Sequence, residues 1–280
     1  MYLRVLTQVA VVVALMILIG LAVVVGRDRL RHTRREYLSR IREIAPVGFA
    51  LGFALVLLRP LRGESYELSW LVGWEATWLI YEIEGQFIVW LQSLETPAMT
   101  AYFSFVYVYG YVFLLVFPIL AYFALADTRP LRLLLSSYAF NYALGLVCYS
   151  LVIAYGPRNV MPELVDALLY DTYPHYQHLT RQVNRNTNVF PSLHTSLAAT
   201  VAFIAYHTRE VYPRWFPIAT VLTVSVAIST MYLAIHWATD VVAGLVLAYV
   251  SVAASKRLVG RWSLSERFEG RLEGLIPFRD

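Results

Sequence analysis

The chain has little of what builds a soluble, disulfide-stabilised or nucleic-acid-binding protein. It has one cysteine, Cys148, so an internal disulfide is excluded. Only 15% of its residues are charged, whereas soluble domains average about 25%. Lysine occurs once, at Lys256, and the net charge of +4 does not indicate a nucleic-acid partner, because most of the arginines flank apolar stretches.

Apolar sequence is abundant instead, in blocks long enough to cross a bilayer. Hydrophobic residues make up 59% of the chain, and the mean hydropathy is +0.56. We therefore predict an all-α fold, a polytopic transmembrane helical bundle of about six to seven spans. The seven apolar stretches lie at about 5–25, 45–58, 100–126, 132–155, 193–207, 215–235 and 238–255.

The first two stretches differ from the others. Stretch 5–25 resembles a signal peptide, but it lacks a small-residue cleavage site and runs into a charged segment, so we expect a retained anchor. Stretch 45–58 is short for a span, and a re-entrant segment is the alternative.

Basic residues predict the orientation, because cytoplasmic loops are enriched in Lys and Arg. Most of the 23 basic residues fall in four segments that a seven-span path puts on one side. That path has the N-terminus outside and the C-terminus in the cytoplasm of a multi-pass cell-membrane protein. The four segments are 27–42, 129–132, 209–214 and the tail from Lys256 onward.

Residues 64–96 are neither a clean span nor a soluble loop. Trp70, Trp74 and Trp78 recur at every fourth position, which predicts one helix lying in the membrane interface. A structural aromatic belt and a surface that grips lipid both fit this pattern.

Two histidine-bearing turns carry the strongest functional signal. They are Phe190-Pro191-Ser192-Leu193-His194 and His236-Trp237-Ala238-Thr239-Asp240. An ionisable group costs about 2.5–3.5 kcal/mol at mid-bilayer, so such groups near spans usually have a function. On the predicted topology, both turns lie at the outer face.

The position of each turn suggests chemistry on an anion. Ser192 is placed to cap a helix, so that His194 projects from the first turn, where unpaired N–H groups favour a phosphate oxygen. His236 and Asp240 are four residues apart, close enough for the carboxylate to bind one ring nitrogen. The other nitrogen is then free to attack phosphorus.

Three arginines, Arg158, Arg181 and Arg185, lie on the outer loop 156–191. Each histidine alone could simply bind a head group or the backbone. A metal site is a second alternative, in which His175 and His178 join His194 and His236. No H-E-x-x-H pattern or cysteine ligand set supports it, and we expect no metal and no cofactor.

At these turns the chain resembles the type 2 phosphatidic acid phosphatase superfamily, whose members are membrane phosphatases and phosphotransferases related to vanadium haloperoxidases. Residues 191–194 match its Pro-Ser-x-His motif completely. Ser229, His236 and Asp240 match Ser-Arg-x5-His-x3-Asp in spacing, but Thr230 stands in the place of the arginine. The Lys-x6-Arg-Pro motif survives only as the remnant Gly156-Pro157-Arg158.

The run from Met231 to Gly244 resembles the inositol phosphorylceramide synthase branch, where the third-motif arginine is often absent. The resemblance covers roughly residues 100–255. It implies that His236 is the nucleophile, that Asp240 orients it and that His194 is the general acid. It also implies a phosphate cradle made by Ser192, Arg158, and Arg181 or Arg185. We expect Arg185 to replace the missing motif arginine, with Arg158 beside it.

These inferences predict three regions and one activity. Residues 1–99 hold the anchor, the short second span and the Trp-rich interfacial segment; residues 100–255 form the catalytic core; residues 256–280 are a charged cytoplasmic tail. The expected activity is cleavage or transfer of a lipid phosphate head group at the extracytoplasmic face, through a phosphohistidine, to water or a small alcohol acceptor. The alternatives are a polyprenyl (di)phosphate phosphatase and a non-catalytic anion or lipid transporter.

Overall fold

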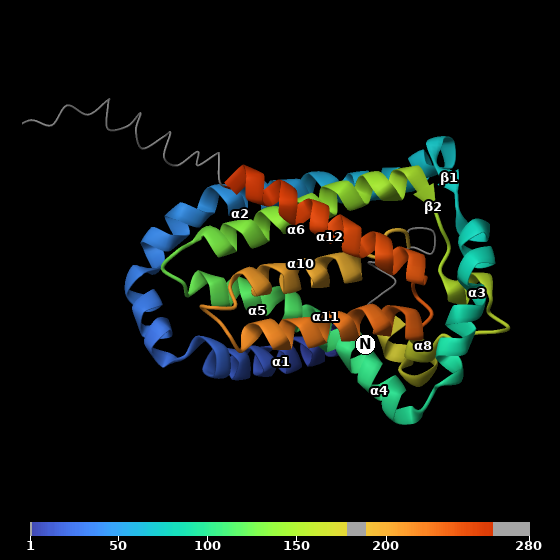
Figure 1. The fold of residues 1–280 in the computed structure, drawn as a ribbon, viewed down its shortest axis with the longest axis horizontal. Coiled ribbons are helices and arrows are strands. Elements are labelled where there is room, and N and C mark those ends of the chain that lie inside the picture. Colours follow the sequence, from blue (N-terminus) through green and yellow to red (C-terminus); the bar gives the residue numbers. More distant parts are fainter. Residues whose placement is uncertain (1, 178–188, 260–280) are drawn as a thin grey trace, which may run out of the picture.

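The computed structural model describes residues 2–177 and 189–259, which form a bundle of helices (Figure 1). The all-α prediction is confirmed, since the strands in this part of the chain are two pairs of residues. In chain order the elements are α1 (Tyr2–Gly20), η1 (Leu21–Val25), α2 (Arg27–Val72), β1 (Trp74–Glu75), α3 (Thr77–Ser93), α4 (Pro97–Phe105), η2 (Val106–Gly110), α5 (Tyr111–Phe123), α6 (Arg129–Leu151), β2 (Val152–Ile153), α7 (Pro157–Val160), α8 (Leu168–Thr172), η3 (Pro174–Tyr176), α10 (Leu193–His207), α11 (Trp215–Tyr232) and α12 (Ala238–Val259).

Five helical segments of the described chain are long and apolar enough to cross a membrane, so the protein is a multi-pass membrane protein. Stretch 193–207 forms α10, which packs against α6, α11 and α12. With 15 residues it is about 22 Å long, shorter than the roughly 30 Å hydrocarbon layer. The five segments are Leu3–Val25, Pro97–Phe123, Arg129–Leu151, Trp215–Tyr232 and Ala238–Val259.

Residues 27–72 differ from expectation. We expected a basic cytoplasmic segment at 27–42 and a separate short stretch at 45–58, spanning or re-entrant, whereas both lie in one 46-residue helix, α2. Figure 1 shows its first part crossing one end of the bundle and its later part running beside α6. The basic run remains helical because charged residues have good helix propensity when one side of the helix faces water.

The three tryptophans do not share the one helix that their spacing had predicted. Helix α2 ends at Val72, β1 pairs in parallel with β2, and α3 starts at Thr77, so the three tryptophans lie on three elements. The chain turns at Gly73, where an added Cβ would lie 2.4 Å from the Ser69 carbonyl oxygen. Helix α3 lies across the end of the bundle (Figure 1).

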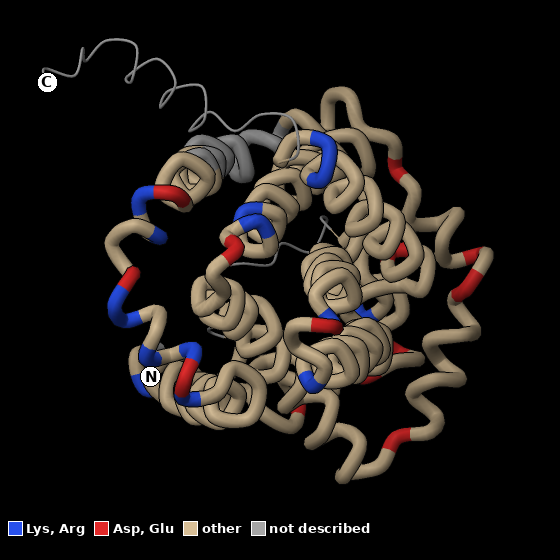
Figure 2. Tube along the Cα trace, turned by 60° about the vertical axis from the view of Figure 1, so that its left-hand side comes forward, with Lys and Arg blue, Asp and Glu red and all other residues tan. Residues whose placement is uncertain are grey.

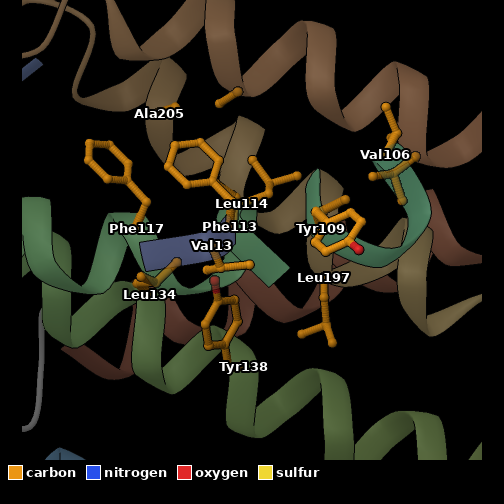
Figure 3. Close-up of a cluster of buried hydrophobic side chains, with 14 of the residues drawn as sticks. Val13, Val106, Tyr109, Phe113, Leu114, Phe117, Leu134, Tyr138, Leu197 and Ala205 are labelled. Carbon is orange, nitrogen blue, oxygen red and sulfur yellow. The ribbon is translucent and has the colours of Figure 1, made fainter. Parts of the chain in front are cut away.

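The core of the bundle combines aliphatic and aromatic side chains, and Figure 3 shows part of it. Phe117 and Trp215 are fully buried with ring centroids 4.6 Å apart. Some polar groups inside the bundle pair with each other, which offsets the cost of burying them. Asn141 on α6 donates to Thr200 at 3.0 Å and accepts from Ser196, both on α10.

The described parts of the four basic segments meet at one end of the bundle. Arg40 on α2 donates to the carbonyl oxygens of Phe123 and Leu125, where α5 ends. Arg214 donates to the Val23 carbonyl oxygen at 3.0 Å, and Lys256 contacts His207 at the end of α10. Figure 2, with this end turned forward, shows basic residues on these segments. His194 lies in the first turn of α10 and therefore at the opposite end.

Candidate functional site

The site is built around the turn between α11 and α12. Helix α11 ends at Tyr232, and the N–H groups of Ile235 and His236 both donate to the Thr230 carbonyl oxygen, at 2.9 and 3.0 Å. The indole of Trp237 is fully buried and donates to the Tyr155 carbonyl oxygen at 2.7 Å. These bonds fix the backbone on both sides of His236.

Asp240 holds the ring of His236. Its Oδ2 lies 3.3 Å from His236 Nδ1 and accepts the Trp237 N–H at 2.9 Å. Burial and, to a smaller extent, the positive charge of Arg158 lower the pKa of His236 to about 3, against an opposing hydrogen bond with the Val189 backbone. The ring is therefore neutral at pH 7. A proton on Nδ1, facing the carboxylate, leaves the lone pair of Nε2 free.

His194 lies beside His236 in different surroundings. Its ring is stacked on Tyr107 with centroids 4.8 Å apart, and the centroid of Tyr111 lies at 4.6 Å. The ring centroids of His194 and His236 are 6.1 Å apart. The two imidazoles, 42 positions apart in the chain, are close enough to contact one phosphate group.

The first turns of α10 and α12 are joined directly. Ser192 caps α10, since its hydroxyl oxygen accepts from the Thr195 N–H at 3.3 Å and from the Thr195 hydroxyl at 3.1 Å. The Ser192 N–H donates to the Asp240 carbonyl oxygen at 3.0 Å. Gly244 permits this approach, because an added Cβ would lie 2.6 Å from the Ser192 carbonyl oxygen. The two helix ends thus form one unit.

Arg158 reaches the same place from the loop after β2. The backbone N–H of Arg158 donates to the Ala234 carbonyl oxygen at 3.1 Å. At Gly156 an added Cβ would lie 2.4 Å from the Ile235 carbonyl oxygen, so only glycine lets this loop pack on the His236 turn. The guanidinium lies 4.8 Å over the Tyr170 ring, and its Nη1 is buried without a hydrogen-bond partner among the described residues. A buried, unpaired cationic donor is suited to an anion.

Other predicted residues do not complete the site. Arg181, Arg185 and His178 fall outside the described residues. Thr230 is fully buried and its hydroxyl donates to the Ala227 carbonyl oxygen, so it supplies no substitute for the motif arginine. His175 contacts the rings of Tyr173 and Tyr176. Among residues 2–177 and 189–259, no three or more His, Cys, Asp or Glu residues group to hold a metal ion.

Three residues of the site were not predicted from the sequence. Tyr107 and Tyr111 lie one helical turn apart, and this spacing gives no reason to pair them with His194. Glu84 on α3 was not considered, although it binds the first turn of α12. The sequence does indicate that Glu84 is buried, because Ile80, Glu84 and Ile88 recur at the spacing of one buried helix face.

Comparison with known proteins agrees with the motifs. A family model described as the PAP2 superfamily matches residues 69–254, and this range includes α3. An uncharacterized protein of Methanocaldococcus jannaschii, MJ0662, is 25% identical over 168 residues, which are 59% of this chain and 64% of that protein. The alignment thus spans less than two thirds of this relative. No solved structure matches the chain significantly. Since the family model covers most of the chain, the protein belongs to the PAP2 superfamily.

Proposed function

We propose that this protein is a membrane phosphatase or phosphotransferase that acts on a lipid phosphate ester through a phosphohistidine at His236. The observation that carries the proposal is the pair of imidazoles 6.1 Å apart. Beside them lie a carboxylate on His236 Nδ1 and the unpaired guanidinium nitrogen of Arg158. Membership of the superfamily supports phosphoryl chemistry at this site.

In the first step, Nε2 of neutral His236 attacks phosphorus. The N–P bond forms as the P–O bond to the leaving alcohol breaks, and protonated His194 gives its proton to the departing oxygen. The ring of His236 becomes a cation, which Asp240 stabilises. Arg158 and Ser192 bind the phosphoryl oxygens, over which the negative charge is spread.

In the second step, neutral His194 takes a proton from water or from an alcohol. The resulting oxygen nucleophile attacks phosphorus, a P–O bond forms, and the N–P bond to His236 breaks. Both histidines then have the protonation states with which they started. Hydrolysis and transfer differ only in which hydroxyl group enters.

A lipid substrate fits the position of the site. The site lies where α10 and α12 begin. In our proposal these helix ends lie near the phospholipid phosphates, and the acyl chains lie along the spans. We propose that this end is extracytoplasmic, because the basic segments gather at the other end. The resemblance of residues 231–244 to inositol phosphorylceramide synthases favours transfer to an alcohol over release of phosphate.

The direct test measures phosphate release from a short-chain lipid phosphate by the purified protein in detergent, with a chelator present. We expect His236→Ala to lower the rate at least about 10⁴-fold. His207→Ala is the matched control, because this histidine lies at the other end of α10 and contacts Lys256. Wild-type protein should also form an acid-labile phosphoenzyme that His236→Ala does not. Equal rates for His236→Ala and wild type would refute the proposal and favour the transporter alternative.

Adding myo-inositol to the same assay separates transfer from hydrolysis. A transferase gives inositol monophosphate and releases less free phosphate. A hydrolase, including a polyprenyl (di)phosphate phosphatase, gives the same phosphate release with or without inositol. Unchanged phosphate release would refute the transferase assignment and would leave the phosphatase assignment standing.

The orientation can be tested with single cysteines in a Cys148→Ala background. Glu163 is exposed at the site end and Glu210 is exposed at the basic end. In intact cells, a membrane-impermeant maleimide should label Glu163→Cys and not Glu210→Cys. The reverse pattern would overturn the extracytoplasmic assignment.

A further inference from the structure

We propose that Glu84 is a positioning residue for this reaction, which holds the first turn of α12 and with it the His236–Asp240 pair. The inference rests on the proposed function. Glu84 belongs to α3, the helix that lies across the site end of the bundle (Figure 1). Its side chain faces inward between Ile80 and Ile88 and is only 9% exposed.

Both oxygens of the Glu84 carboxylate bind the backbone of α12. Oε2 accepts the Ala238 N–H at 2.7 Å, and Oε1 accepts the Thr239 N–H at 2.8 Å. The preceding N–H, from Trp237, goes to Asp240 Oδ2. Thus two carboxylates bind the three consecutive N–H groups that follow His236.

This arrangement is favourable for an ionised carboxylate. The N-terminus of a helix carries partial positive charge, and hydrogen bonds to a charged acceptor are about twice as strong as neutral ones. A buried carboxylate without such partners would be costly. Through these two hydrogen bonds Glu84 fixes the α12 turn on α3. Asp240 is thereby kept at the distance at which it orients His236.

The Glu84 carboxylate also lies near the reacting pair, because the N–H groups that it binds follow His236 directly but for one residue. When the N–P bond forms, the His236 ring becomes positive inside a buried site. Fixed negative charge nearby stabilises that cation, and it acts more strongly away from water. The expected effect is therefore on the chemical step, not on substrate binding, because nothing places Glu84 against the substrate.

The test compares Glu84→Gln with Glu84→Asp. Glutamine keeps one acceptor oxygen but loses the charge and turns an NH₂ group toward a backbone N–H. We expect Glu84→Gln to lower kcat and the single-turnover rate of phosphoenzyme formation about tenfold. KM should stay within about twofold of wild type. Glu84→Asp keeps the charge and should recover part of kcat.

Gln92→Ala is the control for a purely structural role. Gln92 is buried on the same helix and donates to the carbonyl oxygens of Tyr232 and Asp166, without carrying charge. We expect this variant to melt at a lower temperature, with kcat per folded molecule within about twofold of wild type.

Two results would overturn the inference. The first is a kcat per folded molecule of Glu84→Gln equal to that of wild type. The second is an equal loss of kcat in Glu84→Gln and Glu84→Asp, accompanied by the same fall in melting temperature as in Gln92→Ala. If Glu84→Gln does not accumulate, an unchanged kcat in Glu84→Asp is the overturning result. An inactive His236→Ala beside a fully active Glu84→Gln refutes this inference only, whereas an active His236→Ala refutes the proposed function.

Discussion

The two neighbouring histidines of the site have opposite surroundings. His236 is 4% exposed and is held by a carboxylate, by backbone hydrogen bonds and by the turn packed on Gly156. His194 is half-buried and lies between the rings of Tyr107 and Tyr111. The surroundings of His236 fix its tautomer and the direction in which its ring points. The surroundings of His194 fix only the plane of its ring.

This difference suits two different tasks. A nucleophile must be neutral and aimed, and burial keeps the pKa of His236 at about 3. A general acid must take up and release a proton within one catalytic cycle, which is easier for a ring with some access to water. Environments that differ in this way commonly separate the roles of paired catalytic groups.

Removing the imidazole of His194 should have the largest effect among the tests of this difference. We expect His194→Ala to lower kcat about 10²–10⁴-fold on an alkyl phosphate, because the departing alkoxide needs a proton. On p-nitrophenyl phosphate, whose leaving group is stable as an anion, the loss in the first step should be much smaller. Phosphoenzyme formation on both substrates measures this. An equal loss on both would contradict the acid role.

Arg158 should have the next largest effect. Its buried, unpaired Nη1 is the proposed donor to the phosphoryl oxygens, so Arg158→Ala should lower kcat/KM about 10²-fold. Arg158→Lys keeps the charge but not the geometry of the guanidinium, so it should recover only part of the lost kcat/KM. Steady-state kinetics of both variants give the result. A fully active Arg158→Ala would show that another group binds the phosphate.

The burial of His236 predicts a loss of stability in acid. The unfolded imidazole binds a proton near pH 6.5, whereas the folded one does so only near pH 3, so the free energy of unfolding falls as the pH drops below 6.5. At pH 5 the contribution is about 2 kcal/mol. Thermal unfolding in detergent at pH 7 and pH 5 should therefore show a smaller change for His236→Gln than for wild type. The exposed His207→Gln is the control and should behave as wild type does. An equal change in melting temperature for wild type, His236→Gln and His207→Gln would contradict the prediction.

The smallest expected effect concerns the stacking on His194. Aromatic pairs contribute about 0.5–1.5 kcal/mol, so Tyr111→Leu should lower kcat roughly three- to tenfold. Tyr111→Phe keeps the ring and should stay near wild type. Measured on the alkyl phosphate, equal losses in both variants would point to the hydroxyl group instead of the ring.

Local patterns in the sequence predicted the helical class and the motif turns. The apolar stretches gave α5, α6, α11 and α12 approximately, because a helix satisfies its own backbone in lipid. They did not reveal that residues 27–72 form one helix, or that the chain turns at Gly73, where an added Cβ would meet the Ser69 carbonyl oxygen. Glu84 was missed because its partners are backbone N–H groups 154 and 155 positions away, which no local pattern reveals.

The amino-acid order alone determined that this chain forms membrane helices, that it carries two histidine turns at helix ends and that its arginines cluster in four segments. Those properties depend on composition and on spacing within one helix. The tertiary structure decided that His194 and His236 lie 6.1 Å apart, that Arg158 reaches the same turn and that α3 holds α12 through Glu84. Such contacts depend on which helices pack together, and packing is set by the shape of whole faces and by small residues such as Gly156 and Gly244.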